Sequence, residues 1–230
     1  MSNVVLHLSF ESKTGTDRRA VVVDHAVIAG WTGRDTAALE KHIKELEELG
    51  VKRPAMTPIF YRIAARRLTT DDAIEVLGAK SGGEVEFVLL QSGDRLWVGV
   101  GSDHTDREVE AYGVTVSKQM CDKPIGTTFW PMSEVAAHWD RLVLRSHVYE
   151  NGREVLYQEG LASAMRAPDD LIRRYRGGDR LSNGTLMFGG TLAAKGGVRA
   201  TTAITLELED PVLGRRLRHR YRSVSLPIAG

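Results

Sequence analysis

Residues 84–107, EVEFVLLQSGDRLWVGVGSDHTDR, carry the most informative pattern in the chain. Glu84–Leu90 and Leu96–Val100 are short and rich in β-branched and apolar residues, as strands are. The turn residues Ser92-Gly93-Asp94 separate them, which predicts a hairpin of two strands.

The acidic residues of this hairpin suggest a metal site. Glu84 and Glu86 are two apart in a strand, so their carboxylates would share one face and repel each other. On spacing alone, a strand with a solvated acidic face is the simpler interpretation. The hairpin, however, could bring Asp103 from the end of the second strand beside them. Three hard oxygen ligands suit Mg²⁺ or Mn²⁺, and also Ca²⁺.

The rest of the chain favours many short strands. Residues 3–10 and 19–29 indicate a hairpin around the polar turn Lys13–Asp17, and Asn151-Gly152 is a strong hairpin signal. Further strand candidates are Ile59–Tyr61, Ala73–Leu77, Gly113–Val116, Arg141–Val148, Leu186–Phe188, Ile204–Glu209 and Leu217–Val224. Many strands with no regular alternation with helices predict an α+β fold with a mixed β-sheet.

Helices are expected in three places. Asp35 is a plausible N-cap for a helix that Gly50 and Pro54 would end, because apolar residues recur there at helical spacing. Shorter helices are predicted at Ser133–Asp140, with Ser133 as N-cap, and at Pro168–Tyr175. We expect residues 1–56 to form an N-terminal hairpin and helix segment, and residues 57–230 to form the main domain.

Composition excludes several classes of function. The 230 residues include 31 Lys and Arg against 30 Asp and Glu, a net charge of +1, which offers no global field for nucleic acid or an anionic membrane. Cys121 is the single cysteine, so no intrachain disulfide can form. No signal peptide and no apolar run of the ~20 residues that a membrane helix needs are found. A cytoplasmic protein is expected.

The order of motifs along the chain resembles the fumarylacetoacetate hydrolase superfamily. EVEFVLL followed by GSDHTDR is similar to its Glu-x-Glu strand and later Asp turn. Ser117-Lys118 and the segment from Lys123 to Gly126 are similar to its S-K-[SG]-F segment and Pro-Gly turn. Residues 142–160, 183–191 and 207–221 resemble its R-V-N-G-E-x-x-Q-D-G hairpin, its G-D-V-I-x-T-G-T-P strand and its closing strand pair. The likeness covers roughly residues 57–226, and the residues before it look like those of an uncharacterised bacterial subfamily.

The resemblance implies a fold and a site. The fold would be a mixed β-sheet roll or barrel, like the C-terminal domain of the family, with few helices. Glu84, Glu86 and Asp103 would bind the metal, and Lys118 would contact the substrate as the catalytic residue. Thr191 and Gly190 would orient a carboxylate or carbonyl group of the substrate. Two further substrate-binding candidates, near the lid expected after the first core strand, are Tyr61 and Arg66.

The reaction implied is metal-stabilised enolate chemistry on a small 2-oxo or 1,3-dicarbonyl carboxylate, nominally hydrolysis of a C–C bond. Members of the family are commonly homodimers. Of three departures from the family pattern, the most important is that the His-Glu pair that activates water in its hydrolytic members has no match in residues 60–67. In addition, the aspartate and the lysine are closer in sequence than is usual, and Leu192 stands where the proline of G-T-P is expected. His42 and Glu45 have the spacing to share a helix face, although a solvated polar face explains them more simply. A lyase, decarboxylase, hydratase or isomerase therefore remains an alternative, as do a non-catalytic ligand-binding relative and an interaction protein with an acidic strand.

Overall fold

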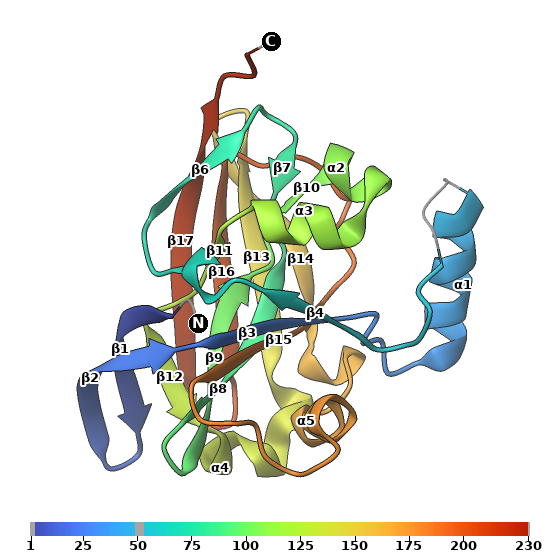
Figure 1. Cartoon of the computed structure of the whole chain (residues 1–230). Helices are drawn as coiled ribbons and strands as arrows, with labels where there is room; N and C mark the ends of the chain where they lie inside the picture. Colours follow the sequence, from blue (N-terminus) through green and yellow to red (C-terminus); the bar gives the residue numbers. More distant parts are fainter. Residues whose placement is uncertain (1–2, 49–52, 230) are drawn as a thin grey trace.

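A computed structural model describes residues 3–48 and 53–229, and in this part of the chain most strands belong to two sheets (Figure 1). The larger sheet has the order β2-β1-β12-β9-β8-β15-β3-β4. Its strands are β1 (Val4–Ser12), β2 (Gly15–Val23), β3 (His25–Gly30), β4 (Ile59–Ile63), β8 (Val85–Ser92), β9 (Arg95–Ser102), β12 (Thr128–Pro131) and β15 (Thr185–Thr191). It combines parallel and antiparallel pairs, so it is a mixed sheet.

The second sheet has the order β14-β13-β16-β17-β6. Its strands are β6 (Ala73–Leu77), β13 (Val143–Glu150), β14 (Arg153–Leu161), β16 (Ala203–Asp210) and β17 (Arg215–Leu226). Two small pairs complete the strands of the described residues: β7 (Ser81–Gly82) with β10 (Thr105–Asp106), and β5 (Leu68–Thr69) with β11 (Lys123–Pro124).

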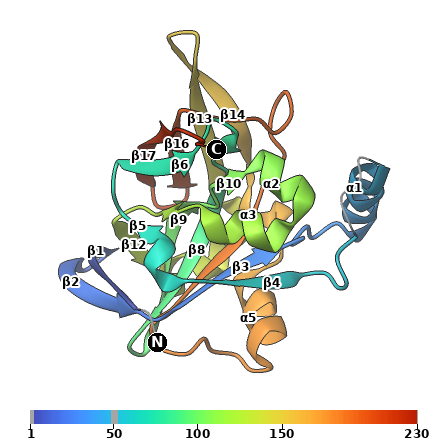
Figure 2. The same cartoon turned by 45° about the horizontal axis from the view of Figure 1, so that its top comes forward.

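The α-helices of the described residues are α1 (Thr36–Glu48), α2 (Arg107–Tyr112), α3 (Val114–Met120), α4 (Met132–Val135) and α5 (Pro168–Arg176). Short 3₁₀ helices lie at Ala65–Arg67, Ala136–Arg141 and Ala162–Ala164. Figures 1 and 2 both show α2 and α3 side by side next to β10, and α1 standing apart from the two sheets. Within the described residues, none of the helices combines the length and apolar character needed to cross a bilayer.

Strand β8 is buried on both faces, which explains its nearly continuous apolar sequence. Val85, Phe87 and Leu89 pack into a core shared with the five-stranded sheet. Val88 and Leu90 face the opposite way, into a second core formed with β1, β3 and β4. The larger sheet therefore packs one face against the five-stranded sheet and encloses the second core largely with its own strands, so both faces exclude water where β8 crosses it.

Several local predictions are confirmed. The β8–β9 hairpin turns at Gly93, which has a φ of 60°. Asn151 and Gly152 have φ values of 50° and 78°, as a tight two-residue hairpin turn requires. The carboxylate of Asp35 accepts from the N–H groups of Ala37 and Ala38 over 2.9 and 3.0 Å, so it caps α1. The expected α+β fold with few helices and a mixed sheet is also found.

Three local predictions are wrong. The run Gly113–Val116 is not a strand: it opens α3, where the N–H of Ser117 donates to the carbonyl of Gly113 over 3.0 Å. Residues 19–29 do not form one strand, because the chain leaves β2 at Asp24 and begins β3, which pairs in parallel with β15. Ser133 is not an N-cap, since α4 begins at Met132 and continues as a 3₁₀ helix.

The N-terminal strands lie in the same sheet as later ones. β1 pairs with β12, and β3 pairs with β15, so residues on both sides of position 56 build one layer. The boundary expected at residue 56 remains a prediction.

Candidate metal and substrate site

The β8–β9 hairpin brings the three predicted carboxylates to one end of the larger sheet. Glu86 lies opposite Gly101 in the antiparallel register. The N–H of Asp103 donates to the carbonyl of Glu84 over 3.2 Å. The charge of Asp103 acts on both Glu84 and Glu86. The three acids therefore lie at the same end of the hairpin, with Glu86 and Asp103 buried and Glu84 partly buried.

The carboxylate of Glu86 is buried and receives a backbone N–H. Glu86 is 2% exposed, and the N–H of Gly190 donates to its Oε2 over 2.7 Å. Burial, followed by the charge of Asp103, raises the pKa of Glu86 well above its ordinary value. One neutral donor does not offset the burial of a full charge, so Glu86 favours either a proton or a nearby cation.

A bulge in β15 aims the N–H of Gly190 at Glu86. The pairing of β15 with β8 shifts register near this end, and Gly190 has a φ of 101°. A Cβ at Gly190 would lie 1.8 Å from Oγ1 of Thr32. A Cβ at the preceding Gly189 would lie 2.0 Å from the ring of Phe87. The two glycines let the backbone approach the site more closely than any other residue would allow.

Asp103 is fully buried between two lysines. The ammonium of Lys118 donates to its Oδ2, and Nζ of Lys123 lies 3.4 Å from its Oδ1. Burial alone would raise the pKa of Asp103, but Lys118 and Lys123 outweigh it and lower that pKa below the ordinary value. Asp103 is therefore ionised at neutral pH.

Lys118 reaches the carboxylates from α3. Lys118 is 8% exposed, and Nζ lies 5.5 Å from the centre of the Tyr61 ring on β4. Burial alone would lower the pKa of Lys118, but Asp103, then Glu110 and Glu84, raise it. The predicted substrate contacts Lys118 and Tyr61 thus lie together beside the acids.

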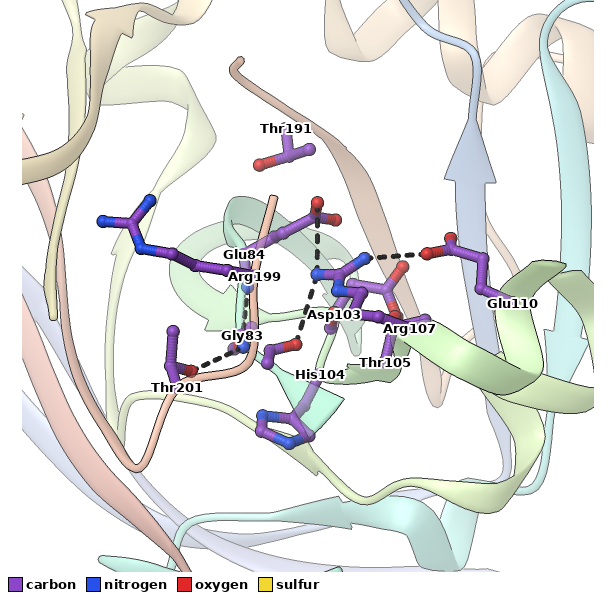
Figure 3. Close-up of polar contacts among 12 residues, drawn as sticks. Gly83, Glu84, Asp103, His104, Thr105, Arg107, Glu110, Thr191, Arg199 and Thr201 are labelled. Carbon is purple, nitrogen blue, oxygen red and sulfur yellow. Dashed lines mark hydrogen bonds and ion pairs between the residues drawn. The ribbon is translucent and has the colours of Figure 1, made fainter. Parts of the chain in front are cut away.

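Glu84 belongs to a second ion-pair group, shown in Figure 3. Nη2 of Arg107 lies 3.2 Å from Oε1 of Glu84, and Nη1 donates to Glu110 over 3.0 Å. Arg107 also donates to the carbonyl of Gly82 over 3.2 Å. Burial raises the pKa of Glu84, and the charge of Arg107 opposes the rise. Arg107 holds Glu84 in position while neutralising part of its charge.

The hydroxyl of Thr191 is held in place by its neighbours. It donates to the carbonyl of Val85 over 2.8 Å and accepts from Nε2 of Gln158 over 2.8 Å. Gln158 is fully buried, and its Oε1 accepts from the N–H of Val85 over 2.9 Å. Thr191 lies opposite Glu86 in the strand register, so its position relative to the acids is rigid.

Arg66 is not brought to the carboxylates. It lies exposed in the 3₁₀ helix Ala65–Arg67 and forms no ion pair within residues 3–48 and 53–229. Of the two residues predicted near the lid, the structure places Tyr61 beside Lys118 and leaves Arg66 on the surface.

His104 points away from the acids, as Figure 3 shows. Its Nδ1 lies 2.9 Å from the hydroxyl of Tyr221, which lies 2.7 Å from Oγ of Ser102. Oγ of Ser102 accepts from the N–H of Glu84 over 3.1 Å. This chain of hydrogen bonds supports the backbone of the site from behind.

Sequence reasoning missed three residues that shape the site: Lys123, Gln158 and Tyr221. Lys123 stood in the quoted Lys-Pro-Ile-Gly segment, and Gln158 occupies the Gln position of the R-V-N-G-E-x-x-Q-D-G hairpin, so both carried a signal. Tyr221 carried none, because it reaches Ser102 from a strand 119 positions later in the chain.

The connection between β3 and β4 carries α1. These two strands are adjacent and antiparallel, so α1 leaves and returns at one edge of the larger sheet. The side chains of His42 and Glu45 lie outside those that the structure describes, and their role remains a prediction.

The donor set fits a hard divalent cation. Three carboxylates supply the oxygen ligands that Mg²⁺, Mn²⁺ and Ca²⁺ prefer. In the described ranges, no three Asp, Glu, His or Cys side chains converge closely enough to hold an ion. Instead, Asp103 bonds Lys118 and Glu84 pairs with Arg107. The acids thus already attract cationic groups to this location.

Solved structures with the same fold bind metals and small molecules. A 2-keto-3-deoxy-D-arabinonate dehydratase complexed with magnesium and 2,5-dioxopentanoate is 14% identical, with 90% of this chain and 74% of that chain covered and a TM-score of 0.62. The 4-oxalocrotonate decarboxylase from Pseudomonas putida, complexed with calcium and acetate, is 16% identical, with 86% and 77% covered and a TM-score of 0.58.

A third structure names the superfamily. The yeast protein ynq8, a fumarylacetoacetate hydrolase family protein, is 15% identical, with 90% of this chain and 95% of that chain covered and a TM-score of 0.63. A search of curated proteins finds no match. A family model described as "Protein of unknown function (DUF2848)" matches residues 29–221. The chain therefore belongs to the DUF2848 family, and it has the fold of the fumarylacetoacetate hydrolase superfamily.

Proposed function

We propose that the protein is a divalent-metal-dependent enzyme acting on a small 2-oxo or 1,3-dicarbonyl carboxylate. The observation that supports this most strongly is the placement of Glu84, Glu86 and Asp103 at the same end of the β8–β9 hairpin, with Lys118 bonded to Asp103. A cation held there would act as a Lewis acid on a carbonyl oxygen and favour an enolate. The magnesium-bound dehydratase and the calcium-bound decarboxylase of the same fold support a metal-dependent role.

The chain's own residues would bind and orient the substrate. The ammonium of Lys118 would lie near negative charge developing on the substrate oxygen, where a fixed positive charge in a buried site is most effective. The ring of Tyr61, 8% exposed, would keep water from that ammonium. To orient a carboxylate or carbonyl group of the substrate, Thr191 would turn its O–H from the carbonyl of Val85 while Gln158 still holds its oxygen, and the N–H of Gly190 would turn from Glu86.

The nominal reaction is hydrolysis of a C–C bond. Hydrolysis needs a general base that activates water, so the identity of that base distinguishes hydrolysis from the alternative reactions. His104 is an unsuitable base because it points to Tyr221 and burial lowers its pKa to about 3. The other candidate for the base that the sequence offers is the pair His42 and Glu45. Loss of turnover in both His42→Asn and Glu45→Gln, with metal binding intact, would assign this pair. Unchanged turnover would favour a lyase, decarboxylase, hydratase or isomerase that needs no such pair.

The test is a screen of 2-oxo acids and acylpyruvates with Mg²⁺, Mn²⁺ or Ca²⁺, followed by detection of pyruvate and CO₂. Incorporation of ¹⁸O from water into a carboxylate product would identify hydrolysis. Metal-dependent thermal stabilisation without turnover on any oxo acid would identify a ligand-binding relative instead. Absence of metal binding would reject the proposal.

We further propose a cytoplasmic homodimer. Sedimentation equilibrium would test the assembly, and a mass of one chain at micromolar concentration would contradict it.

A further inference from the structure

Lys118 occupies a special position among the cations of the site. Its ammonium bonds Oδ2 of Asp103 in a place that is almost closed to solvent. Its charge also lowers the pKa values of Glu84 and Glu86 relative to burial alone. Lys118 therefore acts on all three carboxylates, as a metal ion between them would.

A further cation at Asp103 would meet two cations that are already there. Oδ1 of Asp103 faces Lys123 at 3.4 Å and the hydroxyl of Thr105 at 3.4 Å, and its Oδ2 is bonded to Lys118. The carboxylate keeps a free lone pair on Oδ2, but an ammonium and a divalent cation that share one oxygen repel each other. This repulsion favours the departure of one lysine when a metal binds.

Lys118 is the lysine that can move. Lys123 is fully buried and donates to the carbonyl of His104, so its ammonium is enclosed. Lys118 retains some exposure, and the ring of Tyr61, 5.5 Å from Nζ, can stabilise its charge when it leaves Asp103.

We propose that Lys118 is a built-in competitor for the metal, so that its ammonium and a divalent cation exclude each other at Asp103. The ammonium neutralises the buried acids in the metal-free protein. Once displaced, it becomes available to an anionic substrate. This inference rests on the proposed metal site formed by Glu84, Glu86 and Asp103.

The experiment is a titration of the purified full-length protein with Mn²⁺, followed by isothermal calorimetry and thermal melting. Lys118→Met removes the competing charge and should bind Mn²⁺ at least about tenfold more tightly than wild type, which corresponds to about 1.4 kcal/mol. Its metal-free Tm should fall, because Asp103 loses a partner. Lys118→Arg keeps the charge and should bind within about threefold of wild type. Lys13→Met, an exposed lysine on the β1–β2 turn, is the matched control and should not change affinity.

The outcomes separate the inference from the proposed function. A purely structural lysine would lower the Tm of Lys118→Met and leave Mn²⁺ affinity equal or weaker, which would overturn the inference. If Mn²⁺ binds Lys118→Met but not wild type, the ammonium of Lys118 never leaves Asp103 in the natural protein. That result would support mutual exclusion and reject metal dependence. Binding to neither would reject both.

A second variant is needed in case Lys118→Met does not fold. Lys118→Gln is also neutral and closer in polarity. If both neutral variants are unfolded without metal, they are refolded with Mn²⁺ and followed by circular dichroism. Competition would be supported if Mn²⁺ restores the β-sheet signal and if a further Glu86→Gln change abolishes this recovery. Failure of Mn²⁺ to restore the signal would contradict competition.

Discussion

The hydroxyl groups of Tyr221 and Ser102 lie 2.7 Å apart, and both are buried. Tyr221 belongs to β17 of the five-stranded sheet, whereas Ser102 ends β9 of the larger sheet. The same Ser102 oxygen accepts from the N–H of Glu84. One hydrogen-bond chain thus joins the two sheets directly behind the carboxylates.

Tyr221→Phe should weaken both the fold and the site. The change leaves Nδ1 of His104 without its buried partner and removes one of the two partners of the Ser102 hydroxyl, which costs about 1–3 kcal/mol of unfolding free energy. Urea unfolding would measure the loss, and calorimetry would show weaker Mn²⁺ binding because Glu84 is less well held. Tyr112→Phe is the control, since Tyr112 is 86% exposed. A Tyr221→Phe protein as stable as wild type would contradict this role.

The glycines of β15 should not tolerate a methyl group. Gly190→Ala would place a Cβ 1.8 Å from Oγ1 of Thr32 at a positive φ, and Gly189→Ala would place one 2.0 Å from Phe87. Each should lower stability by about 1–3 kcal/mol or more. Gly178→Ala, with nothing within 4 Å of its Cβ, should be nearly neutral in the same thermal melts. Equal melting temperatures for the three variants would disprove the close approach.

Glu86→Gln should abolish stabilisation by metal without unfolding the protein. The raised pKa of Glu86 shows that its charge is unfavourable where it lies, so a neutral amide should be tolerated in the metal-free form. Wild type at a metal concentration 100 times Kd should gain about 2.7 kcal/mol. Glu75→Gln, an exposed change on β6, should keep that gain. Differential scanning calorimetry with and without Mg²⁺ measures the stabilisation of both variants. If Glu86→Gln were stabilised by Mg²⁺ as much as wild type, Glu86 would not be a metal ligand.

Acid should destabilise the protein partly through His104. Burial, with the charges of Lys123 and Arg107, lowers the pKa of His104 from 6.5 to about 3. His104 is therefore protonated near pH 6.5 in the unfolded chain, but only near pH 3 in the folded protein. Stability is thus lost as pH falls across this window, by roughly 5 kcal/mol in total.

His104→Phe tests the pH dependence. The variant should be less stable at pH 7 because Tyr221 loses a partner, but its stability should fall less steeply between pH 6 and 4. Urea unfolding at a series of pH values measures the slope. His7→Gln, an exposed change, should keep the wild-type slope. An unchanged slope in His104→Phe would show that His104 titrates normally in the folded protein.

Local signals in the sequence predicted local structure well. The turn at Gly93 and the Asn151-Gly152 hairpin depend on neighbouring residues, and both are found. The apolar run beginning at Gly113 misled for the same reason: β-branched residues favour strands locally, but the packing of α2 against α3 decides the outcome.

Contacts between distant residues had little or no local signal. The parallel pairing of β3 with β15, the second lysine on Asp103 and the bond from Tyr221 to Ser102 each join segments that are far apart or on different elements. For the carboxylates, the order of motifs predicted three residues that the structure places at one end of the hairpin, and their role as metal ligands stays a prediction. The order of motifs could not show that Lys118 and Arg107 already engage two of them.

The two buried faces of β8 make the strand intolerant of insertions. Its odd-numbered residues, 85, 87 and 89, enter one core, and Val88 and Leu90 enter the other on the same side as Glu86. One residue added within the strand would exchange the faces, driving the carboxylate between the sheets and an aromatic ring into the site. A residue added at the turn near Gly93 would exchange nothing. Length variation among relatives of this chain should therefore gather at that turn and be absent from β8.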